Sequence, residues 1–123
     1  MLRIRLEQAL KVITQRLGFY IKDEGLVESA LARPATTVSG SPAYASLALA
    51  AAAQTESLAR NHALLDGNKR TAFTLLHVFL SLNDAQLKAE DNALFDYILD
   101  VAQGKLSLEE SAEFIQRHLQ PWH

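Results

Sequence analysis

A run of polar residues between two apolar segments is the part of this sequence best suited to chemistry. The stretch NHALLDGNKRTAF, residues 61–73, holds a histidine, an aspartate, an asparagine and two adjacent cations between His62 and Arg70. The segments on both sides are rich in alanine and leucine. Because such segments predict buried helices, the polar run should form the end of one helix, a short loop and the start of the next helix.

The start of the second helix is typical of an anion site. The first backbone amides of a helix have no acceptor within the helix, and the helix dipole is positive at that end. Gly67, Asn68, Lys69 and Arg70 should therefore form a cradle for phosphate. In such a cradle the glycine lets an oxygen approach the backbone, and the two cations add positive charge.

Asp66 and His62 extend this cradle toward a reaction centre. A phosphate would repel Asp66 unless a cation lay between them, so Asp66 is predicted to be a Mg²⁺ ligand. His62, four residues upstream, could accept the proton of an attacking hydroxyl as a neutral imidazole. Phosphoryl and nucleotidyl transfer need mainly positioning, charge neutralisation and a base. The combination favours an enzyme of that class.

Each of these residues also has a purely structural interpretation. A single histidine at a helix end more often caps the helix than acts as a base, the aspartate could be a helix cap, and the basic pair could be solvated. We favour the functional interpretation because the residues occur together, at this spacing, between apolar helices. A zinc site formed by His62, Asp66 and His77 is a weaker alternative, since three ligands without a characteristic spacing need not converge. His77 itself is predicted to be a core or interface histidine.

The rest of the sequence predicts an all-α fold, a compact bundle of about six helices. Apolar residues recur every three or four positions, and strictly alternating segments are absent. Ser41 followed by Pro42 is typical of a helix start, and Ser107 with Glu110 has capping-box spacing. The segment ATTVSGSP, residues 35–42, should be a surface loop and could act as a flap. Helices are expected at about 3–16, from Asp23 to Pro34, from Ser41 to Asn61, from Asn68 to Asn83, from Asp91 to Gly104, and from Ser107 to Leu119.

Composition places the chain among soluble globular proteins. Its 123 residues fit a single domain covering positions 1–123, and 49% of them are hydrophobic. The net charge of -2 gives no general attraction to nucleic acids or membranes, and neither is an expected partner. The absence of cysteine excludes disulfides and fits a reducing compartment. The longest apolar run, LALAAAA, is far shorter than the roughly 20 residues of a membrane-spanning helix, and the first residues lack a secretory signal. We therefore expect a cytoplasmic protein.

The polar run also carries a family resemblance. HALLDGNKRTA resembles the motif of the Fic/Doc superfamily, H-x-F-x-D/E-G/A-N-x-R, and the stretches IKDEGLVESALARP and LARNH are similar to the Doc (death-on-curing) branch. The resemblance extends from about Ile21 to Leu119, and two matching stretches in the right order make it specific. It implies an all-helical toxin domain from a toxin–antitoxin pair.

The resemblance also implies a reaction. In general Fic proteins the position of Lys69 is glycine, and AMP passes from ATP to a protein hydroxyl. In Doc-type proteins it is lysine, as here, and the γ-phosphate is transferred, because the lysine side chain fills and neutralises part of the anion site. Phe73 stands where AMP-transferring relatives carry a second motif arginine. A Ser/Thr protein kinase using ATP and Mg²⁺ is therefore expected, with an AMP transferase as the alternative.

Roles follow for the residues that match the motif. The implied general base is His62, the implied Mg²⁺ ligand is Asp66, and the implied phosphate-binding groups are Arg60, Gly67, Asn68, Lys69 and Arg70, of which Lys69 and Arg70 also act in catalysis. Leu64 replaces the usual aromatic residue of the motif and Ala63 a frequent proline. Leu64 is still expected to be buried.

The resemblance finally implies partners. Self-inhibited Fic proteins carry Ser or Thr, three residues, then Glu followed by Gly or Asn. The one such glutamate here is Glu24, and Tyr20 stands in the Ser/Thr position. A separate protein antitoxin is therefore expected, with a disordered segment that folds on binding. The implied substrate is translation elongation factor Tu, modified on a threonine. A catalytically inactive antitoxin-binding module is the remaining alternative.

Overall fold

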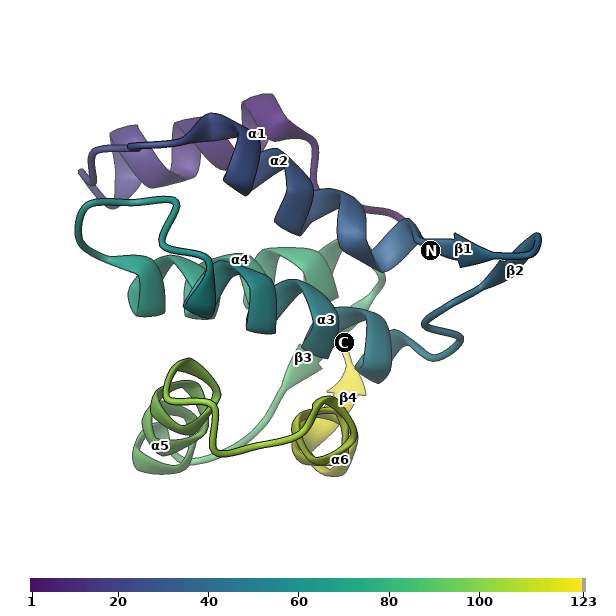
Figure 1. Ribbon diagram of the computed structural model, residues 1–123. Helices are drawn as coiled ribbons and strands as arrows, with labels where there is room; N and C mark the ends of the chain where they lie inside the picture. The colour runs from purple at the N-terminus through teal and green to yellow at the C-terminus, as the bar shows by residue number, and fades with distance from the viewer. Residues whose placement is uncertain (123) are drawn as a thin grey trace.

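Two adjacent helices, α3 (Leu47–Arg60) and α4 (Asn68–Leu82), form the centre of the fold (Figure 1). The computed structural model describes residues 1–122. Helix α3 contacts α2, α4, α5 and α6. Its alanine run from Ala50 to Ala53 is fully buried, and these small side chains let the neighbouring helices approach closely. The prediction of two central helices is confirmed.

The other helices surround this pair and confirm the all-α prediction. The first helix begins at α1 and continues as a wider π-helical turn over Val12–Arg16. Asp23 caps α2, since its Oδ1 accepts a hydrogen bond from the Leu26 amide at 3.2 Å. Ser107 and Glu110 form the predicted capping box at α6. The surrounding helices are α1 (Leu6–Lys11), α2 (Glu24–Ala32), α5 (Asp91–Ala102) and α6 (Leu108–His118).

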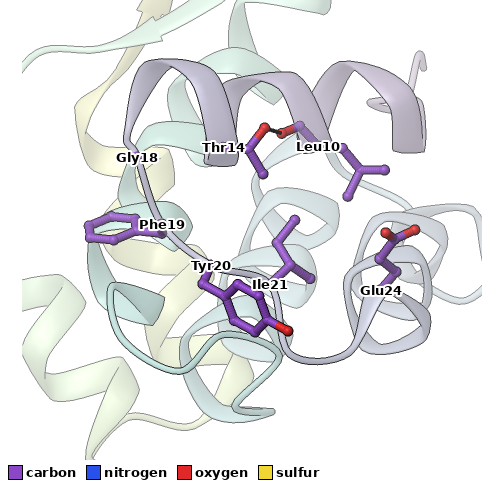
Figure 2. A pocket seen from close by; sticks show the side chains of 7 residues that line it. All are labelled: Leu10, Thr14, Gly18, Phe19, Tyr20, Ile21 and Glu24. Atoms are coloured by element: carbon purple, nitrogen blue, oxygen red, sulfur yellow. Dashed lines mark hydrogen bonds between the residues drawn. The ribbon is translucent and has the colours of Figure 1, made fainter.

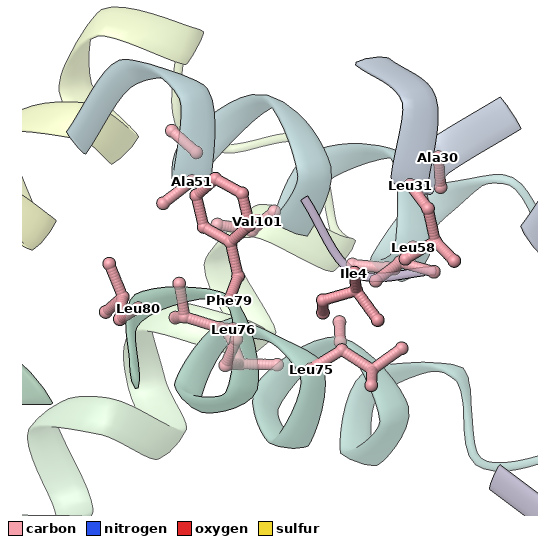
Figure 3. Packing of buried hydrophobic residues seen from close by; sticks show 14 of the residues in the cluster. Ile4, Ala30, Leu31, Ala51, Leu58, Leu75, Leu76, Phe79, Leu80 and Val101 are labelled. Carbon is pink, nitrogen blue, oxygen red and sulfur yellow. The ribbon is translucent and has the colours of Figure 1, made fainter. Parts of the chain in front are cut away.

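Helices α1 and α2 lie on one side of the central pair, and α5 and α6 on the other (Figure 1). The core between them contains Phe79, Leu75, Leu76 and Leu80 of α4, which pack with Ala51 and Leu58 of α3 (Figure 3). On the α5–α6 side, Tyr97 stacks on Phe114 with 4.3 Å between ring centroids. The Tyr97 hydroxyl lies 2.6 Å from Ser111 Oγ. Burial raises the pKa of Tyr97 to about 12.

The predicted start of α3 is wrong. The helix begins at Leu47 rather than at Ser41, and Ser46 caps it by accepting a hydrogen bond from the Leu49 amide at 3.1 Å. Ser41–Pro42 instead forms strand β2, paired antiparallel with β1 (Thr37–Val38). Ser39 and Gly40 have φ values of 53° and 82°. Their left-handed backbone turns the chain back before any helix can form.

This β1–β2 hairpin lies at the far end of α3 from the α3–α4 loop (Figure 1). Arg33, which precedes the hairpin, joins the segment that follows the hairpin to α3. Its Nε donates to the Tyr44 hydroxyl at 3.1 Å, and its Nη1 donates to Glu56 Oε1 at 2.9 Å. The segment expected to act as a flap is therefore separated from the polar loop by the 14 residues of α3.

A second strand pair was not predicted. Strand β3 (Ala85–Leu87), which follows α4, pairs antiparallel with β4 (Leu119–Pro121), which follows α6. Gln86 extends this pairing because its side-chain Nε2 donates to the backbone oxygens of Pro121 and Trp122, each at 2.9 Å. Within residues 1–122, no helix is both long enough and apolar enough to cross a bilayer.

Candidate active site

The polar run occupies the loop between α3 and α4, as predicted. Asn61 ends α3 and holds the loop at its entrance, since its Nδ2 donates to Leu26 O at 2.9 Å and its Oδ1 accepts from the Ala63 amide at 3.2 Å. Ala63 is 1% exposed and Leu64 is 2% exposed. Leu64 therefore fills the buried position of the motif aromatic, and that expectation is confirmed.

A neighbouring segment of the chain fixes the loop from the side. Ile21 and Leu64 form an antiparallel bridge. The amides of Lys22 and Asp23 both donate to Ala63 O at 2.9 Å. Because these contacts join the start of α2 to the α3–α4 loop, the backbone around the polar residues is held from two directions.

The side chain of Asn68 closes the loop, and the phosphate role of this residue stays a prediction. Its Nδ2 donates to Leu64 O at 3.1 Å, and its Oδ1 accepts from the Leu64 amide at 3.1 Å. Both polar groups of the side chain are therefore used to close the loop. Its backbone amide is the first amide of α4 and belongs to the predicted cradle.

Gly67 precedes the first residue of α4 with a φ of 89°, and it has no side chain to cap the helix amides. A Cβ atom added there would lie 2.5 Å from the Phe19 ring. The glycine is thus required by its left-handed backbone and by the aromatic ring against it. Asp66 lies just before it, and its Oδ1 accepts from the Gly67 amide at 2.8 Å.

Two cavities meet at the start of α4. The larger has a volume of about 700 Å³ and the smaller about 250 Å³. Asp66, Gly67, Asn68 and Lys69 line both. His62 and Leu65 line only the smaller cavity, beside Gln103, whereas Arg70 lines only the larger. The structure therefore brings the predicted base, the predicted metal ligand and the predicted phosphate cradle together around connected space.

Apart from Phe73, the larger cavity includes residues that the sequence did not reveal. Leu17, Phe73 and Phe95 form part of its apolar wall, and Asp91 and Asn92 stand at the start of α5. Except for Phe73, these residues come from parts of the chain far from the motif. Phe95 of α5 is 65% exposed in the structure.

A third cavity, of about 450 Å³, lies beside the segment that connects the first helix to α2 (Figure 2). Leu10, Phe19, Ile21 and Glu24 are among the residues that line it, together with Thr14, whose hydroxyl donates to Leu10 O at 2.7 Å. None of the predicted site residues lines this cavity. It is separate from the two cavities at the start of α4.

Two predicted residues lie outside these cavities. Arg60 is exposed at the end of α3, and its guanidinium lies beside Gly104. Its phosphate role stays a prediction. His77 is half-buried, with its Nδ1 3.0 Å from Phe73 O and its ring 4.5 Å from the Phe73 ring. In the part of the chain that the structure describes, no three His, Cys, Asp or Glu side chains group to hold a metal, so the alternative zinc site is not formed.

This helical fold, with its motif loop at the start of a central helix, is that of a known family. A sequence model of the Fic/DOC family matches residues 4–80, which include both central helices except for the last two residues of α4. The chain belongs to the Fic/DOC family. It is similar to the protein named Toxin Doc of Mycolicibacterium smegmatis, with 53% identity over 70 residues, 57% of this chain and 54% of that protein. The similarity supports the Doc branch, and the chain spans about half the length of the relative.

Proposed function

We propose that this chain is the toxin of a toxin–antitoxin pair and acts as a Doc-like protein kinase. It transfers the γ-phosphate of ATP to a serine or threonine hydroxyl of a translation factor, with elongation factor Tu as the proposed target, and so inhibits translation in the cytoplasm. The observation that carries this proposal is that His62 and Lys69 line the same cavity at the start of α4. The similarity to a protein named Toxin Doc supports the toxin role.

The larger cavity suits a nucleotide. Its volume of about 700 Å³ is in the usual range for small-molecule sites. One wall is apolar, with Phe73 and Phe95, and can hold a base. The lining also includes Lys69, Arg70 and the start of α4, which can hold phosphates because they combine full charges with the positive end of the helix dipole.

Asp66 fits the proposed role of magnesium ligand. Its side chain is exposed and borders both cavities. Of the two carboxylate oxygens, the Gly67 amide contacts Oδ1 and not Oδ2. Mg²⁺ in nucleotide sites is commonly held by one or two carboxylates, with phosphate oxygens and water as the other ligands. One aspartate at this position is therefore sufficient. When bound, the ion supplies charge neutralisation between the nucleotide phosphates.

The residues around the smaller cavity can then perform the transfer. His62 is exposed, so a protein hydroxyl can reach its imidazole. The imidazole accepts the hydroxyl proton, the hydroxyl oxygen forms a bond to the γ-phosphorus, and the bond from that phosphorus to the bridging oxygen breaks, which releases ADP. Lys69, Arg70 and the helix amides stabilise the negative charge on the transferred group.

Two observations favour γ-phosphate transfer over AMP transfer. Lys69 borders both cavities, where a glycine would leave the anion site open. Phe73 forms part of the apolar wall, at the position of the second arginine in AMP-transferring relatives. A separate antitoxin is proposed as the inhibitor, because Glu24 lines the third cavity and neither of the two at the start of α4.

One experiment distinguishes the candidate reactions. Purified protein is incubated with elongation factor Tu, Mg²⁺ and ATP, and the target is analysed by mass spectrometry. The expected result is one added phosphate on a serine or threonine, which is lost in His62→Ala. An added AMP would instead establish the transferase alternative. An unmodified target, with growth inhibition unchanged in His62→Ala cells, would favour the inactive binding module.

A further inference from the structure

Helix α5 runs along both cavities at the start of α4, and its residues divide between the cavities in chain order. Asp91 and Phe95 line only the larger cavity. Leu99 lines both cavities, and Gln103 lines only the smaller one. Leu99 therefore marks the place on α5 where the two cavities meet. Because a helix rises about 1.5 Å per residue, Asp91 lies roughly 12 Å along α5 from this junction.

The carboxylate of Asp91 has no partner within residues 1–122. The residue is exposed, and none of the three salt bridges in this part of the chain involves it. Glu90 holds the cap position of α5, and no side chain caps the helix amides. A negative charge in the first turn interacts favourably with the helix dipole, but that interaction leaves both carboxylate oxygens facing solvent or the cavity. Asp91 is thus an acceptor that lines the larger cavity.

The position of Asp91 separates it from the proposed magnesium site. Asp66 borders both cavities, whereas Asp91 borders only the larger one. Side chains of a helix tilt toward its N-terminus, which carries the Asp91 carboxylate further from the junction. Ligands of Mg²⁺ lie at about 2 Å from the ion, so one ion at the junction cannot contact both aspartates. The partner of Asp91 must be a hydrogen-bond donor of another kind.

The length of ATP indicates which part of the nucleotide lies near Asp91. When the γ-phosphate lies at the junction beside Lys69, the other two phosphates extend into the larger cavity and the ribose follows them. Phe95 is four residues after Asp91, and residues at this spacing are neighbours on one helix face. A base packed against Phe95 therefore keeps its own ribose next to the Asp91 carboxylate.

The chemistry of the two groups also matches. An ionised carboxylate has two acceptor oxygens and no donor. The ribose presents two adjacent hydroxyl donors, whereas adenine presents an amino donor beside a ring nitrogen that is an acceptor. Of the uncharged parts of ATP, only the ribose can donate to both oxygens at once. Hydrogen bonds to a charged acceptor are stronger than those between neutral groups.

We propose that Asp91 binds the 2′- and 3′-hydroxyls of the ribose and thereby selects ribonucleotides as phosphate donors. This inference rests on the proposed function and adds the sugar that the enzyme selects. The contact also depends on the direction of the nucleotide. An ATP whose α-phosphate lay at the junction would hold its ribose nearer to Leu99, short of Asp91. Asp91 is a specificity-determining residue and takes no part in the transfer.

The test measures by calorimetry the binding of ATP, 2′-deoxy-ATP and 3′-deoxy-ATP in the presence of Mg²⁺. The wild-type protein is expected to bind ATP about tenfold more tightly than either deoxynucleotide, the effect of one hydrogen bond to a charged group. In Asp91→Ala the three affinities should become nearly equal. Asp96→Ala is the matched control, because it removes an exposed aspartate of the same helix that lines neither cavity. It should keep the full preference for ATP.

Several results would overturn the ribose contact. One is equal binding of ATP and the deoxynucleotides by the wild-type protein, and another is a preference that persists in Asp91→Ala. An equal loss of affinity for all three nucleotides in Asp91→Ala would indicate a structural role in α5 instead. Inosine triphosphate tests the base. A preference for ATP over this nucleotide that is lost in Asp91→Ala, while the preference over the deoxynucleotides remains, would show that the carboxylate contacts the base.

Label transfer into elongation factor Tu, measured in parallel, separates the contact from the function on which it rests. Transfer from the γ position together with the expected preference supports both. An Asp91-dependent preference without any transfer would refute the proposed kinase alone. Transfer from the α position would refute both, since the ribose would then lie short of Asp91. No binding of ATP by the wild-type protein would also refute both.

Discussion

The side-chain amide of Asn68 holds both backbone polar groups of Leu64, with each hydrogen bond 3.1 Å long. This contact closes a small ring of chain around Asp66 and Gly67, at the point where the two cavities meet. The asparagine of the motif therefore shapes the cradle, while the residues on either side of it contact the space where a nucleotide would bind.

Replacing Asn68 with alanine should damage both stability and activity. The Leu64 amide and carbonyl lose their partners next to a buried side chain, which costs about 2 kcal/mol. Urea denaturation measures the loss in the free energy of unfolding, and label transfer from ATP measures the activity. Asn92→Ala is the control because it changes an exposed asparagine of α5 that also lines the larger cavity. Equal stability of the two variants would argue against the closing role of Asn68.

Gly67→Ala should be more destabilising than an alanine at another left-handed glycine. Gly18 has a φ of 75° and no atom within 4 Å of an added Cβ, whereas an added Cβ at Gly67 meets the Phe19 ring. Gly18→Ala should cost about 1 kcal/mol from backbone strain, and Gly67→Ala clearly more. Thermal unfolding of both variants checks this order. Adding Phe19→Ala to Gly67→Ala should recover less than the whole loss, since the backbone strain remains.

Asp66→Ala should remove the magnesium dependence of nucleotide binding. ATP affinity measured by calorimetry with and without Mg²⁺ should differ by roughly tenfold or more in the wild-type protein, and should become nearly equal in the variant. Asp91→Ala alters the other aspartate of the larger cavity and should leave the dependence intact. An undiminished Mg²⁺ effect in Asp66→Ala would refute the metal assignment.

Lys69→Gly should weaken transfer of the γ-phosphate. The variant opens the anion site and removes a positive charge next to the transferred group, so the rate should fall by about a hundredfold. Transfer is followed in parallel with ATP labelled at the α and at the γ position. Lys88→Gly removes an exposed lysine away from both cavities and should leave the rate unchanged. An unaltered γ-transfer rate in Lys69→Gly would contradict the role of the lysine.

Tyr97 should make the protein sensitive to alkaline pH. Its pKa is raised to about 12 by burial, whereas a tyrosine in the unfolded chain titrates near 10. The unfolded state therefore loses its proton first as the pH rises, and the stabilising contribution, fully present below about pH 10, is lost as the pH approaches 12. The free energy of unfolding should fall by roughly 2 to 3 kcal/mol over this range. Urea denaturation should show a shallower fall in Tyr97→Phe, and equal slopes would contradict the burial effect.

The sequence was sufficient to predict the helices and the motif loop because their signals are local. Helical periodicity located α3 and α4, and the polar residues at the start of α4 followed from their spacing. The start of α3 was mispredicted because Ser41 and Ser46 are both good helix caps. The left-handed turn at Ser39 and Gly40 places Ser41 in a strand and leaves Ser46 as the cap. Whether such a turn forms depends on contacts with the surrounding chain.

Contacts between distant residues could not be predicted in this way. Nothing in the spacing of the motif reveals that Phe19 lies against Gly67 or that Phe95 lines the same cavity as Lys69 and Arg70. The contacts of the Asn68 side chain with Leu64 were not predicted, because their partners are backbone groups, which leave no mark in the residue pattern. Strands β3 and β4 have three residues each, which is too short for an alternating pattern to be recognised.

The two ends of α4 are held in different ways, because the pairing of β3 with β4 involves only its C-terminal end. The C-terminal end of α4 is joined to the segment that follows α6 through this short strand pair, so the helix is anchored at the end away from the candidate active site. Its beginning is held separately, by the Asn68 contacts with Leu64 and by the bridge between Ile21 and Leu64. Changes that loosen the strand pair, for instance at Gln86, would then affect the motif loop only by displacing the whole helix.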